Sequence, residues 1–231
     1  MFKRHVFLTV VLAGVLLASG CTQQQGRFQL KDLAKSDIDL VADLHRNATL
    51  AALKELNAKL YRLNPVQLSK MPNETIESRW QQLLKHQGQA GGFNELAGAG
   101  GIAAMRLAFD NNYEGDRIFA LMAGLSGMLD EAYGFKSEFY LLDSVDGQKL
   151  YNSARNLEVM VWLLRSRKDP RGEPLIYSDS ISSELVNLSF ERLFGKLIAH
   201  QDMMSQIMQG KTQRAVNTVA HGIVSMTFVP L

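Results

Sequence analysis

Apolar residues recur every three or four positions from about residue 36 onward, which is the spacing of one face of an α-helix. The first such run begins where Ser36 or Asp39 can act as an N-cap, and Pro65 predicts its end near Asn64. One stripe of this helix contains Ile38, Val41, His45, Ala48, Ala52, Leu56, Leu60 and Leu63. We therefore expect a long first helix that buries this stripe.

Six later segments are also expected to be helical, and most of them begin with a residue that can accept a hydrogen bond from the first helical turn. Asn73, Asp116, Asp146 and either Ser182 or Ser183 are the expected N-caps. The expected helices are 73–86, 102–109, 116–133, 147–167, 183–209 and 216–224.

Two of these helices carry apolar residues around most of their circumference. In 147–167 this pattern predicts a central helix. Segment 118–129 is too short to span a bilayer and indicates a buried helix centre, in which Ala120, Gly124 and Gly127 permit close approach of a neighbour. Helices 102–109 and 116–133 are expected to form a hairpin beside the glycine-rich segment, and its insertion into lipid is the alternative.

Segment 135–142 is the one candidate for extended structure. The glycines between Gly88 and Gly101 indicate close backbone approach or mobility, and they lack the Lys and Ser or Thr of a phosphate-binding loop. The fold predicted from these patterns is all-α: a compact bundle of six or seven helices with a glycine-rich central segment.

The first 21 residues show a different pattern. Lys3 and Arg4 are followed by an apolar run and then by Ala18-Ser19-Gly20-Cys21. This order resembles a bacterial lipoprotein signal peptide, although Ala18 stands where the class more often has Leu. The resemblance implies cleavage before Cys21 and diacylation of its sulfur. An ordinary secretory peptide with an accidental cysteine is the alternative reading.

The resemblance also implies a domain organisation and a location. Residues 1–20 are the signal, 21–35 the lipidated N-terminus with a polar tether, and 36–231 a single helical periplasmic domain. Thr22 occupies the position where Asp would favour inner-membrane retention, so we expect an outer-membrane anchor facing the periplasm. The tether reaches at most about 50 Å when fully extended.

Removal of the signal changes the charge of the chain, because residues 1–20 contain two basic residues and no acidic one. The remainder has 23 basic and 23 acidic residues. A neutral domain gives no electrostatic reason to expect nucleic-acid binding. Cys21 is the only cysteine, so we expect neither a disulfide nor a thiol catalyst in the mature domain.

No recognisable catalytic or metal-binding motif is present. Asp110, Asn112 and Glu114 resemble the first half of an EF-hand loop, but Leu121 replaces the bidentate Glu, so a polar turn is the favoured interpretation. The histidines lack zinc-site spacing, and His45 is interpreted as a packed core residue rather than a ligand or base. We therefore predict no metal, no cofactor and no defined catalytic residue.

Two regions are candidate contact surfaces for a protein partner or lipid. The first is a basic loop, for which a solvated loop is the alternative. The second is a methionine-rich face of the last long helix, for which core filling is the alternative. The candidate residues are Arg165, Arg167, Lys168, Arg171, Gln201, Met203, Met204 and Met208.

From these patterns we predict a non-catalytic, lipid-anchored envelope protein that binds a protein partner during envelope assembly or maintenance. The alternative is lipid or amphiphile binding by the glycine-rich hairpin and the methionine-rich helix. A third hypothesis is an enzyme acting on envelope polymers, which requires His45, His200 or a carboxylate to converge in one pocket. The oligomeric state is left open by the sequence.

Overall fold

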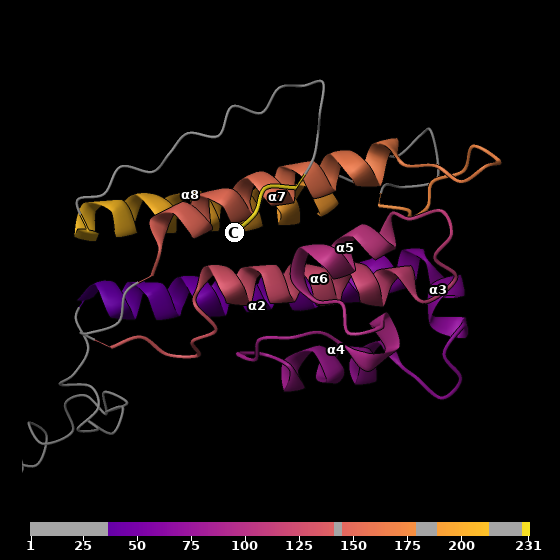
Figure 1. Ribbon diagram of the computed structural model, residues 1–231, viewed down its shortest axis with the longest axis horizontal. Helices are drawn as coiled ribbons and strands as arrows, with labels where there is room; N and C mark the ends of the chain where they lie inside the picture. The colour runs from indigo at the N-terminus through magenta and orange to yellow at the C-terminus, as the bar shows by residue number, and fades with distance from the viewer. Residues whose placement is uncertain (1–36, 141–144, 179–188, 213–227) are drawn as a thin grey trace, which may run out of the picture. The chain divides into compact units, whose positions relative to one another are not determined.

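The helical periodicity of the sequence is realised over most of the described chain. The computed structural model describes residues 37–140, 145–178, 189–212 and 228–231. Within these residues it contains seven α-helices and no β-strand (Figure 1), which confirms the predicted all-α bundle of six or seven helices. The α-helices are α2 (Asp37–Leu63), α3 (Pro65–Ser69), α4 (Ile76–Lys85), α5 (Gly101–Ala108), α6 (Arg117–Ala132), α7 (Gly147–Ser166) and α8 (Ser189–Thr212). A 3₁₀ turn, η2 (Asn94–Leu96), lies in the glycine-rich segment.

The predicted caps of α6 and α7 are confirmed. Asp116 accepts a hydrogen bond from the backbone N–H of Phe119, and Asp146 accepts one from Gln148. The predicted cap Asn73 is wrong, because α4 begins two residues later. Its N-cap is Thr75, which exchanges reciprocal hydrogen bonds with Ser78 in a capping box.

Other boundaries also differ from the sequence predictions. Pro65 ends α2 but also starts the short helix α3, since proline fits the first helical turn. Residues 135–140 contain no strand and instead begin with the end of a turn, in which Phe135 has a φ of 59°, followed by a bend at 137–138. The expected helix start near Ser182, the final helix 216–224 and positions 141–142 lie outside the described residues.

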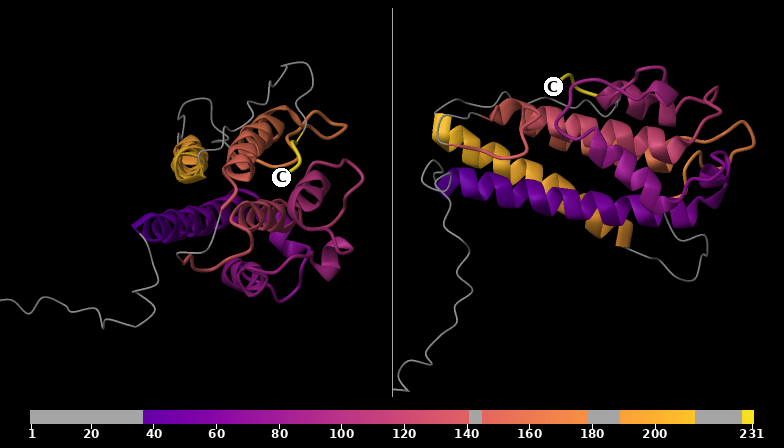
Figure 2. Two further views of the ribbon diagram at one scale, coloured as in Figure 1. Left: turned by 60° about the vertical axis from the view of Figure 1, so that its left-hand side comes forward. Right: turned by 90° about the horizontal axis from the view of Figure 1, so that it is seen from below.

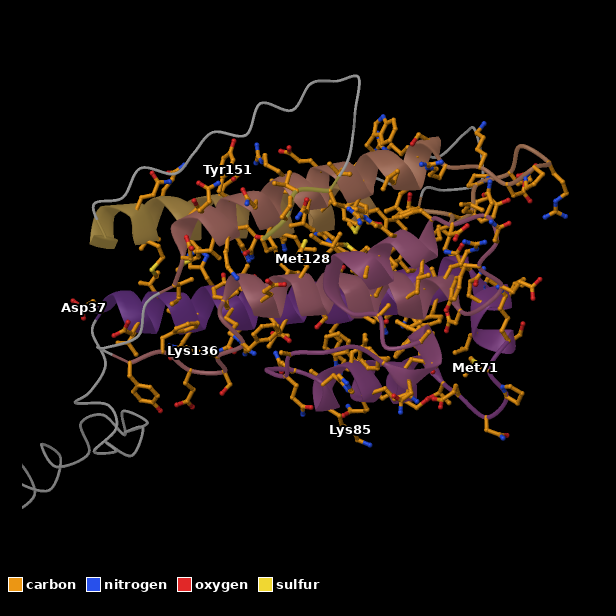
Figure 3. All side chains as sticks on the ribbon, in the orientation of Figure 1. Asp37, Met71, Lys85, Met128, Lys136 and Tyr151 are labelled. Atoms are coloured by element: carbon orange, nitrogen blue, oxygen red, sulfur yellow. The ribbon has the colours of Figure 1, made fainter. Side chains whose placement is uncertain are left out.

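Helix α6, rather than α7, occupies the centre of the helical unit. Nearly all α6 side chains are buried, and Met128 lies between α6 and α7 (Figure 3). By contrast, α7 keeps an exposed ridge that includes Glu158 and Trp162. The prediction of α7 as the central helix was therefore wrong, because its outer apolar residues are not covered by a further described helix.

Helices α5 and α6 pack closely, as the small residues of α6 predicted. A Cβ added to Gly124 would lie 2.4 Å from the backbone nitrogen of Met105, which no side chain can tolerate without movement. Helix α8 runs antiparallel to both α7 and α2, and Figure 2 shows it alongside α2. No described helix is long and apolar enough to cross a bilayer.

The buried apolar side chains form two separate clusters. The larger is built around α5, α6, the second half of α2 and the beginning of α8. The smaller contains Ala42, Tyr133, Leu150 and Met204, among others. The four long helices α2, α6, α7 and α8 each pass through both clusters, so each crosses the boundary between them.

Candidate functional site

The first half of α2 buries polar residues and exposes apolar ones. Arg46 and Thr49 are buried, whereas Leu40 is 49% exposed and Leu44 67% exposed. The stripe predicted to be buried is therefore correct only in part: Ala52, Leu56 and Leu60 are buried, but Ala48 is exposed. This reversal of the usual pattern requires polar partners inside the domain, and it leaves large apolar side chains on the surface.

A layer of buried polar side chains lies at the boundary between the two apolar clusters. We call it the polar layer, and all four long helices contribute to it. Its members are Arg46 and Thr49 of α2, Asp130 of α6, Tyr133 at the C-cap of α6, Ser153 of α7 and Gln201 of α8. Such a layer, built from facing helices, is where helical bundles commonly hold ligands.

Arg46 is the cation of the polar layer and is only 6% exposed. Its Nη2 lies 3.5 Å from Oδ1 of Asp130, which is an ion pair without hydrogen-bond geometry. The other oxygen of Asp130 accepts the backbone N–H of Gly88 at 3.3 Å. Burial raises the pKa of Asp130, and the Gly88 N–H and Arg46 oppose that rise. Nε and Nη2 of Arg46 have no hydrogen-bond partner among the described residues.

The other helices present further donors. Gln201 is fully buried, and its Oε1 accepts a hydrogen bond from Ser153 Oγ at 3.2 Å. Its amide and the side chain of Thr49 face the hydroxyl of Tyr133, although neither Nε2 of Gln201 nor that hydroxyl reaches hydrogen-bond geometry with a described residue. Burial raises the pKa of Tyr133 to about 12, while Gln201, Arg46 and Thr49, which face its hydroxyl, lower it in part.

A histidine pair borders the layer on the α2–α8 side. The rings of His45 and His200 meet edge to face with centroids 5.4 Å apart. Nδ1 of His200 is 3.4 Å from Thr49 Oγ1, whereas Nδ1 of His45 has no partner among the described residues. Burial lowers the pKa of both histidines. Sequence spacing alone did not predict that these two would meet.

A second buried arginine, Arg79 of α4, has a very different environment. It donates hydrogen bonds to Glu95 at 2.5 and 2.9 Å, to Asp116 at 3.2 Å and to Tyr61 at 3.3 Å. Its guanidinium also stacks 3.6 Å from the ring centre of Phe119. Burial raises the pKa of Asp116 despite these bonds. This network links α2, α4, η2 and α6, and it is structural because its donors are engaged by the protein itself.

The glycine-rich segment covers a small hollow beside α6. The hollow is lined by His86, Gly91, Phe93, Gly127 and Asp130, among others, and holds about 10 Å³, the space of one water molecule. His86 stacks on Phe93 with ring centres 4.1 Å apart. Small-molecule sites usually measure about 300–1,000 Å³, so this hollow is too small to enclose a lipid chain.

The basic loop predicted as a contact surface is partly neutralised by acidic neighbours. Arg165 pairs with Glu191 of α8 at 2.5 Å, and Arg171 pairs with Asp169 at 2.8 Å. Arg167 and Lys168 are exposed. The structure therefore leaves a smaller positive surface here than the sequence indicated.

The methionine-rich face of α8 is divided between core and surface. Gln201, Met204 and Met208 are buried, so the core-filling alternative describes both methionines, while Met203 is 52% exposed. The structure does not bring this face together with the basic loop into one site. Cys21, the predicted lipidation residue, lies outside the described residues.

Met203 instead belongs to an apolar surface shared with α2. Thr49 faces His200, and Glu55 pairs with Arg192 at 3.6 Å, which fixes the antiparallel register of α2 and α8. This register sets Leu44 level with Met203. We call the exposed apolar residues on either side of this seam the outer face: Leu40, Leu44 and Ala48 of α2, with Ala199 and Met203 of α8.

The described residues contain no group of three or more His, Cys, Asp or Glu side chains arranged to hold a metal ion. Comparisons with protein-family models, with curated proteins and with solved structures found no match to the chain.

Proposed function

We propose that this chain is an outer-membrane lipoprotein, anchored through Cys21 and facing the periplasm, whose helical domain binds a protein partner without catalysis. The partner belongs to envelope assembly or maintenance. The observation that carries the binding role is the outer face, where Leu40, Leu44 and Met203 are each about half exposed or more. Large apolar side chains gathered on one surface are characteristic of interaction sites.

The position of the outer face favours a function near the anchor. Leu40 and Leu44 lie in the first turns of α2, which begins at Asp37 (Figure 3). A tether of residues 22–35 joins this point to Cys21, so the face stays within about 50 Å of the anchored residue. A partner in the same membrane or close to it is therefore within reach.

A protein surface fits the outer face better than a bilayer does. The exposed carboxylate of Asp37 precedes Leu40 by one helical turn, and anionic headgroups repel it. The alternative of amphiphile binding loses support because Met204 and Met208 are buried and the glycine-lined hollow holds only one water. A protein partner with an apolar patch needs neither an uncharged approach past Asp37 nor a cavity that encloses a lipid chain.

Site-specific photocrosslinking in intact cells tests this proposal. A photoreactive amino acid replaces Leu44 or Met203 in the full-length chain, and a matched control replaces the exposed Gln81 of α4. We expect both outer-face positions to capture the same single protein, which Gln81 does not capture. The charge substitution Leu44→Asp should abolish capture from position 203. Adducts with lipid alone, or identical adducts from all three positions, would contradict the proposal.

The anchor has a separate test. Labelling with palmitate should modify the wild-type chain, and the Cys21→Ser variant should lose the label and leave the membrane fraction. Unchanged labelling of that variant would rule out Cys21 as the modified residue, while the crosslinking result would still report on the outer face.

A further inference from the structure

The described segment 228–231 lies against α7 (Figures 1 and 2). Phe228 is 8% exposed and belongs to the larger apolar cluster, and Leu231 packs against the same cluster. Between them, Val229 is half-buried and Pro230 is exposed. The first and fourth side chains therefore anchor the segment, while its middle is held in a different way.

Two asparagines of α7 hold the main chain of this segment. The fully buried amide of Asn156 accepts the backbone N–H of Val229 at 2.6 Å and donates to the carbonyl oxygen of the same residue at 2.8 Å. Asn152, one helical turn earlier, donates from Nδ2 to the carbonyl oxygen of Pro230 at 2.8 Å. Gln148 donates to Oδ1 of Asn152, which leaves Nδ2 free to bond the segment. The segment therefore runs antiparallel to α7 and is gripped at two successive residues.

The Asn156 contact recognises a main chain rather than a particular side chain. A side-chain amide offers a donor and an acceptor, which match the C=O and N–H of any residue except proline. Asn64, the N-cap of α3, makes the same pair of hydrogen bonds with the backbone of Tyr177, each at 2.8 Å. Because one asparagine holds a tyrosine and the other a valine, this type of contact accepts different residues.

The burial of Asn156 means that its amide needs such a main chain. A buried amide group left without a partner costs about 1–3 kcal/mol, so states in which an extended peptide pairs with Asn156 are favoured. Segment 228–231 supplies that peptide in the structure. Residues 213–227 separate it from Thr212 at the end of α8, so it is attached to the domain as a short peptide on a long connection.

We propose that α7 carries a peptide-binding groove, in which Asn152 and Asn156 bind the main chain of an extended segment from another protein. The ligand is uncharged, with an aromatic side chain that enters the larger apolar cluster and an aliphatic side chain three residues later. Segment 228–231 has this chemistry and occupies the groove until a partner segment displaces it. The groove is separate from the outer face, and the proposal does not depend on the function proposed above.

Fluorescence anisotropy of a labelled peptide with the sequence of residues 226–231 tests the groove in the full chain in detergent. Val229→Pro in the protein removes the N–H that Asn156 accepts and leaves Phe228 unchanged, so it should loosen the attached segment. We expect saturable binding to this variant, with an apparent affinity about tenfold tighter than that of the wild type. In the wild type the attached segment competes at an effective concentration on the order of millimolar.

A second peptide and two further variants are the controls. The peptide that carries the Val229→Pro change lacks the same N–H and should bind the Val229→Pro protein about tenfold more weakly than the first peptide does. Adding Asn156→Ala to this protein should abolish binding of the first peptide. Adding Asn64→Ala instead removes the matching contact at Tyr177 and should leave the peptide affinity unchanged.

Circular dichroism checks that each variant keeps its helical content. The two peptides are compared on one protein, so the test remains decisive if Asn156→Ala does not fold. Absence of saturable binding to the Val229→Pro protein, or equal binding of the two peptides, would show that segment 228–231 is only a structural part of the domain.

Discussion

Arg46 and Arg79 are both buried arginines, yet only one of them is fully engaged by the protein. Arg79 has four hydrogen-bonding neighbours and an aromatic ring against its face. Arg46 has one ion pair at 3.5 Å, and its Nε–Nη2 edge has no hydrogen-bond partner among the described residues. The two sites lie in the same helical unit and differ in how completely buried charge is compensated.

This difference separates a structural network from a candidate site. Burying a guanidinium costs free energy, which good geometry and complete hydrogen bonding offset at Arg79. At Arg46 the compensation is incomplete, and the same half of α2 exposes Leu40 and Leu44. Local conflict between sequence pattern and burial is typical of positions retained for function rather than stability.

The largest expected effect is that of removing Arg79. Arg79→Met leaves the buried carboxylate of Asp116 and the partly exposed one of Glu95 without their cation, and we expect a loss of about 3–5 kcal/mol in the free energy of unfolding. Urea denaturation of the full chain in detergent measures this loss. The exposed variant Arg62→Met should stay within about 0.5 kcal/mol of wild type. Similar losses in the two variants would show that the Arg79 network is not structural.

Arg46→Met should lower the free energy of unfolding by less than Arg79→Met does, and a second substitution should restore most of that loss. Arg46→Met removes one ion pair but also two unpaired donors, so we expect a loss of about 1–3 kcal/mol. Adding Asp130→Asn removes the remaining charge and keeps an acceptor for Gly88, which should return the double variant to within about 1 kcal/mol of wild type.

The matched pair at the other site should behave differently. Glu95→Gln added to Arg79→Met leaves Asp116 buried without a cation, so the double variant should remain strongly destabilised. The same urea denaturation compares the four variants. The distinction between the two arginines would be contradicted if the Arg79→Met/Glu95→Gln variant regained the stability of the wild type. It would also be contradicted if the Arg46→Met/Asp130→Asn variant were no more stable than Arg46→Met.

A smaller effect is expected from the histidines beside the polar layer. Burial lowers the pKa of His45 and His200 below 6.5, so the unfolded chain binds more protons than the folded chain as the pH falls. Stability present above the unfolded pKa of about 6.5 should therefore be lost as the pH decreases toward the lower folded pKa values.

Unfolding free energies at about pH 7.5 and about pH 5.5 measure this dependence. His200→Gln removes one titrating group and keeps a polar side chain opposite Thr49, so its stability should fall less over this interval. The control is Arg62→Met, an exposed change on α2 that leaves both histidines in place and should keep the wild-type slope. An equal slope in all three proteins would exclude the histidine pair as its cause.

The sequence was sufficient to predict the helical fold but only part of the candidate site. Helical spacing and the caps Asp116 and Asp146 identified α6 and α7 because both signals are local. The polar layer could not be predicted from such local signals. Arg46, Asp130 and Gln201 are far apart in the chain, and only tertiary packing brings them together. Of these residues, only Gln201 could be recognised in the sequence, because it is a polar residue in the middle of an apolar stripe.

Met203 was among the candidate contact residues, but the α2 part of the outer face was missed for a related reason. Periodicity identifies a helix but does not decide which of several faces is buried when apolar residues surround it. Leu40 and Leu44 are more apolar than Arg46 and Thr49, yet the latter are inside because α6 and α8 provide polar neighbours there. Met203 and Met204 likewise differ in burial because they lie on different faces of α8, and only Met204 faces the smaller apolar cluster.

The most direct measurement of the distinction between the two arginines is the nuclear magnetic resonance signal of each side-chain Nε–Hε group. The signals are assigned with Arg46→Met and Arg79→Met, and the rate at which each Hε exchanges with water is measured in the wild-type chain. We predict faster exchange at Arg46, whose Nε has no hydrogen-bond partner among the described residues, than at Arg79, whose Nε donates to Tyr61. Equal exchange rates, or slower exchange at Arg46, would contradict the account.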